Sequence, residues 1–215
     1  MTLAALQAAA QAHGLTIRGG LHPDADPTLP QGARTLVMIG PDEPRFWPIF
    51  TAAPEYSDGL PDPMDRWSKR ILPALAAPYH GTALFPSDGP PYPPFIQWAQ
   101  ASGHSWPSPV GLLVHDDAGL FVSYRGVIAL PDHYDLTAGQ RPCDTCAAPC
   151  LTACPVDAFA SGSYDVPRCQ AHVHVSAACQ SGCLVRRACP VARGFERLPD
   201  QSAFHMSAFM RNYRP

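Results

Sequence analysis

The chain is poor in charge and has no long apolar run. Only 15% of its 215 residues are charged and the formal net charge is -3, so it lacks the basic excess of proteins that bind nucleic acids or anionic membranes. No apolar stretch reaches the ~20 residues that a transmembrane helix needs. The first residues, M-T-L-A-A-L-Q-A-A-A-Q-A-H-G, have no basic start, which indicates an amphipathic helix rather than an export signal. We therefore expect a cytoplasmic protein with reduced thiols.

Cysteine is absent before position 143 and after position 189, so all eight cysteines fall in one stretch. They form two groups that end in the similar phrases C-L-T-A-C-P-V and C-L-V-R-R-A-C-P-V. This similarity indicates two diverged copies of one unit. The first group is Cys143, Cys146, Cys150 and Cys154, and the second is Cys169, Cys179, Cys183 and Cys189.

Closely spaced cysteines followed by a Cys-Pro pair are typical of proteins that hold two [4Fe-4S] clusters. In such proteins the cysteine before the proline ligates the other cluster. This crossing rule assigns Cys143, Cys146, Cys150 and Cys189 to one cluster, and Cys169, Cys179, Cys183 and Cys154 to the second. The spacing departs from the usual bacterial run, because Ala147, Ala148 and Pro149 separate the second cysteine from the third.

Three other interpretations of the thiols remain open at this point. The chain could hold one cluster and keep spare ligands. Disulfides would suit a secreted protein, but no export signal is expected here. Structural zinc usually takes two C-x2-C pairs, and only Cys143 and Cys146 make one.

Before the cysteines, the hydrophobic pattern predicts alternating helices and strands around a mixed or antiparallel sheet. Asp117-Ala118-Gly119 is typical of a hairpin turn between two apolar strands within Val110–Pro131. We expect a boundary near Thr137–Gln140. The predicted parts are an α+β domain over residues 1–138, a cluster module over 139–192 and a C-terminal tail over 193–215.

The hairpin stretch, V-G-L-L-V-H-D-D-A-G-L-F-V-S-Y-R-G-V-I-A-L-P, resembles the hairpin of the cobalamin-processing CblC (MMACHC) family. That family has a similar V-x-x-H…G-G-x-F-x-x-R-G-V-x-x-L-P signature. The segment D-P-M-D-R-W resembles a D-P-x-D segment upstream of the hairpin in the same family. Together the two matches span roughly residues 61–136.

The cysteine region, with R-C-Q-A-H-V followed by C-Q-S-G-C, is similar to epoxyqueuosine reductase. That enzyme joins a CblC-like, nitroreductase-related cobalamin domain to two [4Fe-4S] clusters, and reductive dehalogenases share the plan. The resemblance implies a nitroreductase-like or CblC-like sheet-and-helix domain followed by a small module like a bacterial ferredoxin. It also implies a corrinoid in the first domain.

Five residues outside the cysteines are candidate cofactor contacts. By the resemblance, Arg125 matches the arginine that contacts the thiol co-substrate in CblC, and His115 matches a histidine one strand earlier. Gly126 follows Arg125 on the same strand. Asp88 and Tyr92 lie in the turn-rich loop S-D-G-P-P-Y, a kind of loop that often lines pockets. Surface ion pairing of Arg125 and a structural role for His115 are the alternative interpretations.

The expected function is that of an iron–sulfur oxidoreductase that binds cobalamin and passes single electrons to its cobalt, either to reduce it or to remove its upper axial ligand. An electron-donor protein, such as a ferredoxin, a flavodoxin or a reductase, would be its partner. Two alternatives remain: a ferredoxin-type electron carrier without a corrinoid, and a cobalamin-dependent reductase of a small organic substrate.

Overall fold

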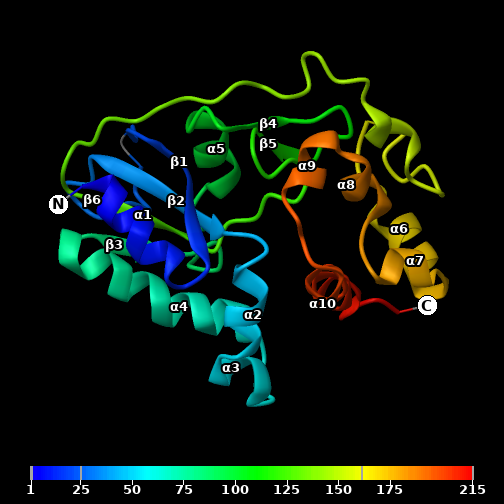
Figure 1. Ribbon diagram of the computed structural model, residues 1–215, viewed down its shortest axis with the longest axis horizontal. Coiled ribbons are helices and arrows are strands. Elements are labelled where there is room, and N and C mark those ends of the chain that lie inside the picture. Colours follow the sequence, from blue (N-terminus) through cyan, green and yellow to red (C-terminus); the bar gives the residue numbers. More distant parts are fainter. Residues whose placement is uncertain (1, 25, 161, 215) are drawn as a thin grey trace. The chain divides into compact units, whose positions relative to one another are not determined.

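The computed structural model describes residues 2–24, 26–160 and 162–214, which form helices and strands (Figure 1). These residues divide into two compact units. The first unit runs to His104 and resumes from Ser123 to Gln140, and the second contains Ser105–Val122 and the chain from Arg141 onward. No helix in the described ranges is both long and apolar enough to cross a bilayer.

A four-stranded antiparallel sheet forms the centre of the first unit, in the order β1-β2-β6-β3 (Figure 1). Every residue of β2, T-L-V-M-I-G-P, is buried, as expected of a central strand covered on both faces. Thr35 pairs with Leu130 and Ile39 with Gly126, which fixes the register of β2 against β6. The strands are β1 (Leu15–Leu21), β2 (Thr35–Pro41), β3 (Thr82–Leu84) and β6 (Gly126–Leu130).

Two helices of the first unit pack against each other and against the sheet. Helix α4 contacts β3 and β6, and α1 contacts β1 and α4. The rings of Phe46 and Phe50 both meet Trp67 of α4 edge-on, at 5.5 and 6.0 Å, and extend this core. The helices are α1 (Leu3–Gln11), α2 (Phe46–Thr51), α3 (Pro54–Ser57), α4 (Pro63–Ala76), the 3-10 helix η1 (Ala77–Tyr79) and α5 (Phe95–Ala101).

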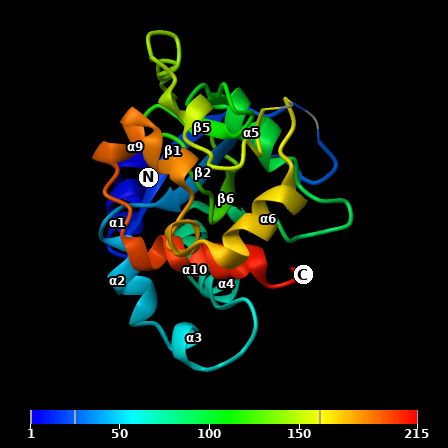
Figure 2. The ribbon, with the colours of Figure 1, turned by 90° about the vertical axis from the view of Figure 1, so that its right-hand side faces the viewer.

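The second unit is built of short helices and one small sheet. Strand β4 (Ser105–Pro107) pairs with β5 (Leu113–His115). Helix α10 lies beside α6 (Figure 2) and also contacts α7, and the Gln170 side-chain amide donates to the carbonyl of Phe209 at 3.0 Å. The helices are η2 (Pro149–Thr152), α6 (Val166–Val175), α7 (Ala177–Gln180), α8 (Leu184–Ala188), α9 (Pro190–Gly194) and α10 (Pro199–Met210).

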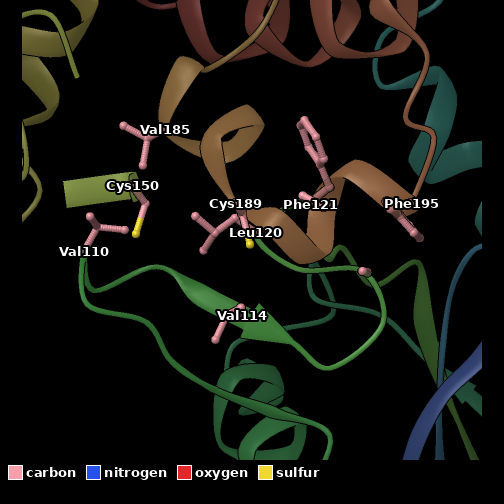
Figure 3. Packing of buried hydrophobic residues seen from close by; sticks show 10 residues of the cluster. Val110, Val114, Leu120, Phe121, Cys150, Val185, Cys189 and Phe195 are labelled. Atoms are coloured by element: carbon pink, nitrogen blue, oxygen red, sulfur yellow. The ribbon is translucent and has the colours of Figure 1, made fainter. Parts of the chain in front are cut away.

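One hydrophobic core joins the two segments of the second unit. Val110, Val114 and Leu120 come from the first segment and pack in the same cluster as Cys150 and Cys189 (Figure 3). Residues 105–122 therefore supply much of the apolar surface on which the cysteine region packs. This segment lies well before Cys143 in the chain.

The prediction of a hairpin within Val110–Pro131 is wrong about its second strand. The turn is present, because His115 and Gly119 exchange backbone hydrogen bonds of 3.1 and 3.0 Å. Strand β5 nevertheless pairs with β4, and Leu120 and Phe121 form no strand. The backbone carbonyls of Leu120 and Phe121 accept hydrogen bonds from side chains instead of from a neighbouring strand. Arg186 donates to that of Leu120, and Arg197 donates to that of Phe121 at 2.8 Å.

The compact units also divide the chain differently from the expected ranges 1–138, 139–192 and 193–215. The break after Gln140 lies close to the expected boundary, but residues 105–122 belong with the cysteine region. The tail, which contains α10, belongs to the same unit as the cysteines. Within the described part of 139–192 there is no strand, so the two-stranded sheet of this unit comes from outside that range.

Candidate metal centre

The first cysteine group lies in tight turns and one short 3-10 helix. Cys143 and Cys146 belong to the turns, and Cys150 lies in η2 and is buried. Ala148, just before η2, has a left-handed conformation with φ of 49°. Its N–H donates to Sγ of Cys146 at 3.3 Å. The bend at Ala148 thus presents an amide hydrogen to a thiol sulfur, as loops that hold iron–sulfur clusters do.

Four cysteines drawn from both groups line one small cavity of about 20 Å³. The buried side chains of Val114 and Leu120 form an apolar part of its wall. Cys189 lines this cavity together with three cysteines of the first group. Grouping by sequence order would have put Cys154 there instead. We call these four the first set: Cys143, Cys146, Cys150 and Cys189.

The thiols of the first set also interact electrostatically. Burial raises the pKa of Cys143, and the nearby thiols of Cys146, Cys150 and Cys189 raise it further, against a smaller opposing effect of Arg141. Burial likewise raises the pKa of Cys150, although backbone hydrogen bonds to its sulfur oppose this. Four thiolates this close repel one another, so a cationic centre among them would relieve the repulsion.

The remaining four cysteines form a second set: Cys154, Cys169, Cys179 and Cys183. Cys169 lies on α6 and Cys179 on α7, while Cys183 directly precedes α8. Burial raises the pKa of Cys169, and the thiols of Cys183, Cys154 and Cys179 raise it further. The N–H of Ala158 donates to Sγ of Cys154 at 3.3 Å. These two sets are the ones that the crossing rule assigns.

The spacing of the thiols distinguishes between kinds of metal centre. All eight cysteines are free thiols, so they form no disulfide. Among the described residues, no three cysteine sulfurs lie within 4.8 Å of one another. Tetrahedral zinc, with Zn–S bonds of about 2.3 Å, would bring its thiolates to about 3.8 Å apart. The thiols of each set are therefore more widely spaced than the thiolates around one bound zinc ion.

Three polar residues around the two sets were not identified from the sequence. Ser108 lines the cavity of the first set, and its hydroxyl is buried without a hydrogen-bond partner. Tyr164 donates a hydrogen bond to the sulfur of Cys169. Arg186 lies close enough to Cys183 and Tyr164 to interact with both electrostatically. Ser108 lies well before the cysteines, and Tyr164 and Arg186 lie between them, but the cysteine spacing does not mark any of the three as a neighbour of the sulfurs.

The orphaned hydroxyl of Ser108 is consistent with a sulfur-rich group in the cavity. A buried polar atom without a partner costs free energy, and a native protein usually satisfies it. Thiolate or sulfide sulfur would accept a hydrogen bond from this hydroxyl. The residues around the first set therefore fit the iron–sulfur cluster that the cysteine pattern indicates.

In the first unit, Arg125 is engaged with Asp65. The guanidinium Nη1 lies 3.4 Å from the Asp65 carboxylate, and burial lowers the pKa of Arg125 while Asp65 raises it. These two residues come from the two segments that resemble CblC. The neighbouring Gly126 has a packing role, because a Cβ there would approach Leu72 to 2.4 Å.

His115 is buried and holds the turn that follows it. Its Nδ1 accepts hydrogen bonds from the backbone N–H groups of Asp117 and Ala118, at 3.0 and 3.2 Å. This geometry occupies the Nδ1 lone pair, so a cofactor would have to meet the histidine at Nε2. His115 belongs to the second unit, whereas Arg125 and Gly126 belong to the first.

Asp88 and Tyr92 share a loop but have different surroundings. Asp88 accepts hydrogen bonds from the backbone of Phe85 at 2.9 Å and from Lys69 at 3.0 Å. Tyr92 is exposed. Asp88 therefore stabilises the loop, and Tyr92 is free to contact a ligand from the solvent side.

No protein-family model, no curated protein and no solved structure matches this chain.

Proposed function

We propose that this chain is an iron–sulfur protein that holds two [4Fe-4S] clusters and transfers single electrons, with the cobalt of a bound cobalamin as the acceptor. Cys143, Cys146, Cys150 and Cys189 would hold one cluster, and Cys154, Cys169, Cys179 and Cys183 the other. When bound, such clusters accept and release one electron at a time. The protein would act as an oxidoreductase together with an electron-donor protein.

The observation that carries the proposal is the exchange of Cys154 and Cys189 between the two sets. Cys189 lines a cavity with three cysteines of the first group, while Cys154 interacts with Cys169 of the second. In two-cluster ferredoxins of the bacterial type, the cysteine before the proline ligates the other cluster in this way.

The chain's own residues would exclude water and hold the charge of the clusters. Val114 and Leu120 form an apolar wall beside the first set, which lowers the local dielectric and limits hydrolysis. The N–H groups of Ala148 and Ala158 donate to ligand sulfurs. Each donor-protein molecule would lose one electron per step, and the acceptor would gain that electron.

The corrinoid part of the proposal rests on the resemblance to CblC. The two segments that carry it meet in the first unit, where Arg125 contacts Asp65. Reduction of the cobalt by one electron would weaken its bond to an upper axial ligand, which would leave. Cobalamin supplies this chemistry, and the protein would supply the binding site and the electrons.

A second candidate function is electron transfer between proteins without a corrinoid. It is favoured by the state of two candidate corrinoid contacts, because Arg125 is paired with Asp65 and Asp88 is paired with Lys69. In that case the first unit would serve as a docking platform, and a second protein would be the electron acceptor.

Anaerobic reconstitution followed by cobalamin titration tests both parts. Iron and sulfide analysis should find about eight of each per chain for two clusters. Reduction of the loaded protein in the presence of one equivalent of cob(III)alamin, which has no EPR signal, should then produce the EPR signal of base-off cob(II)alamin. Full iron content with cobalamin left in its free-solution form would favour the second candidate. Stoichiometric zinc and no sulfide would contradict both.

A further inference from the structure

Helices α6, α7 and α10 of the second unit line a pocket of about 260 Å³ that shares no residue with the cavity of the first set. Its wall is mainly apolar, and Met206 and Met210 face it from successive turns of α10. Methionine is unbranched and polarizable, so such a wall adapts to the shape of a partner. The volume lies below the roughly 300–1,000 Å³ typical of small-molecule sites. The pocket therefore suits an apolar side chain of a partner protein better than it suits a cofactor.

The helices that line this pocket also carry ligands of the second set. Cys169 lies one turn before Val173 on α6, and Cys179 of α7 directly precedes Gln180. The side-chain amide of Gln180 donates to the carbonyls of Val173 and His174, at 3.0 and 3.1 Å, and so ties the two helices together. A partner in the pocket would thus contact the same helices that carry Cys169 and Cys179. Because electron transfer slows steeply with distance, this is a favourable place for an electron donor.

An exposed apolar side chain follows the pocket lining in the chain. Val175 is the last residue of α6, directly after His174, and is 76% exposed. It has the largest exposed fraction among the large hydrophobic side chains that the described residues leave in water. An apolar side chain in water beside an apolar pocket is typical of an interaction surface. We call the pocket and Val175 together the docking face.

Exposed arginines border the docking face where α10 ends. Arg211 directly follows Met210, Arg214 lies in the segment after α10, and both side chains are exposed. The ring of Tyr213 has its centroid 5.6 Å from that of the His174 ring, and this contact holds the segment beside the pocket. The docking face therefore has positive charge along its α10 side.

A third exposed arginine lies beside α7. Arg187 donates from Nη2 to the carbonyl of Ser181 at 2.6 Å, and Ser181 directly follows Gln180 of the pocket. The surrounding stretch is basic as well, since residues 166–215 contain seven arginines and two acidic residues. Their formal charge is +5, whereas that of the whole chain is -3. The docking face thus lies in a basic part of an acidic chain.

We propose that the docking face binds an acidic one-electron donor protein, which inserts an apolar side chain into the pocket and pairs its carboxylates with Arg187, Arg211 and Arg214. This inference rests on the proposed function, because it names the place where the two-cluster protein receives its electrons. The reduced donor loses one electron, and the cluster of the second set gains it.

Charge and shape together favour this occupant. A [4Fe-4S] cluster with four thiolate ligands is anionic, so the arginines offset the repulsion between the second set and an acidic donor. An RNA would pair its phosphates with the arginines, but it has no aliphatic side chain to fill the pocket. A protein with an apolar side chain among carboxylates matches both parts of the docking face.

A plant-type [2Fe-2S] ferredoxin, an acidic one-electron carrier, serves as the probe. Isothermal titration calorimetry of the reconstituted protein with oxidised ferredoxin gives the Kd. We expect binding that weakens as the salt concentration rises, because ions screen the attraction between opposite charges. Anaerobic stopped-flow mixing with reduced ferredoxin then measures the rate of cluster reduction, which should have the same salt dependence. Photoreduction with deazaflavin shows independently that the clusters accept electrons.

Variants separate the charge from the pocket. Arg211→Glu should raise the Kd about tenfold at low salt and flatten its salt dependence. Arg193→Glu makes the same change in net charge at an exposed site on α9, which does not line the pocket, and should change the Kd less than about twofold. Met210→Gln keeps every charge and should weaken binding equally at all salt concentrations.

The outcomes distinguish this inference from the proposed function. A loaded wild type that does not bind ferredoxin, or a Kd that neither salt nor Arg211→Glu changes, would overturn the inference and leave the clusters in place. A dimer that Met210→Gln dissociates would assign the face to a second copy of the chain, and an RNA that displaces ferredoxin would assign it to nucleic acid; either would overturn the inference. A wild type without clusters would overturn the proposed function itself.

Discussion

Cys150 and Cys189 line the same cavity, although Cys154 is far closer to Cys150 in the sequence and belongs to the other set. This relationship can be tested with pairs of substitutions. Cys150→Ala with Cys189→Ala removes two ligands of one set and should leave about half of the iron. Cys154→Ala with Cys169→Ala should do the same for the other set.

The matched combination takes one cysteine from each set. Cys150→Ala with Cys154→Ala should deplete iron from both clusters, even though these two cysteines are neighbours in the sequence. Iron and sulfide analysis after anaerobic reconstitution gives the measurement. If this neighbouring pair kept half of the iron, and Cys154→Ala with Cys169→Ala lost all of it, the ligands would follow sequence order instead.

Gly119 should be intolerant of a side chain. It has φ of +55°, and a Cβ there would lie 2.6 Å from the backbone nitrogen of Ala192. Gly111 has φ of +75° but nothing within 4 Å of its Cβ position, so it provides a matched control. We expect Gly111→Ala to lower the free energy of unfolding by about 1 kcal/mol, from backbone strain alone. Gly119→Ala should cost about 2 kcal/mol more, because backbone atoms must move.

Thermal unfolding of the reconstituted proteins would measure the glycine pair. Iron retention at a temperature between the two unfolding midpoints gives a second readout, since the turn at Gly119 packs against the helix that follows Cys189. Equal losses of stability in the two variants would show that the close approach to Ala192 has no energetic role.

Substitutions of the two partners in the Arg125–Asp65 ion pair should lower the free energy of unfolding by different amounts. The Arg125 side chain is 15% exposed and that of Asp65 is 57% exposed. Asp65→Asn would leave the buried guanidinium without its carboxylate and should cost about 1 kcal/mol, a value limited by the exposure of Asp65. Arg125→Met should cost less, because it removes the buried charge and keeps most of the apolar side chain. Denaturant titrations of both variants and the double variant would measure the coupling.

Acid should weaken the first unit through Glu55. Arg70 donates to both carboxylate oxygens of Glu55, at 2.5 and 2.9 Å, and holds the pKa of Glu55 below its usual value of about 4.5, against an opposing effect of burial. Because the folded-state pKa is lowered, this stabilisation is complete above the unfolded-state pKa. It is lost as the pH falls through the folded-state pKa.

Comparing a Glu55 variant with the wild type at several pH values would measure this contribution of the ion pair to stability. Glu55→Gln should lower the free energy of unfolding by about 1 kcal/mol at neutral pH, since half of the Arg70 side chain is in water. The difference from the wild type should shrink below pH ~4. A difference that stayed constant down to that pH would rule out the ion pair as its source.

Much of the second unit's chemistry could be predicted from local sequence, because cysteine spacing is a short-range property. The grouping of the eight cysteines and the turn at Asp117–Gly119 are of this kind. The α+β class also follows from local hydrophobic pattern, and the strand T-L-V-M-I-G-P is buried throughout as its composition suggests.

The packing of residues 105–122 against the cysteine region could not be predicted from the sequence, because it depends on contacts between segments that are far apart in the chain. Leu120 and Phe121 read as a strand, yet Arg186 and Arg197 bind their carbonyls and remove the need for a neighbouring strand. Arg186 and Tyr164 lie between cysteines and Ser108 lies well before them, and the cysteine spacing marks none of the three. Their roles arise only where the folded chain brings them beside sulfur atoms.

The chain passes between its two units three times, after His104, after Val122 and after Gln140. Neither unit is therefore a continuous stretch that could be cut out or exchanged by a single break. A fragment that ended at Gln140 would carry Val110 and Leu120 without the cysteine region that covers them. During synthesis, residues 105–122 emerge before β6, the strand that joins β2 to β3. The first unit's sheet is therefore complete only after part of the second unit has already been made.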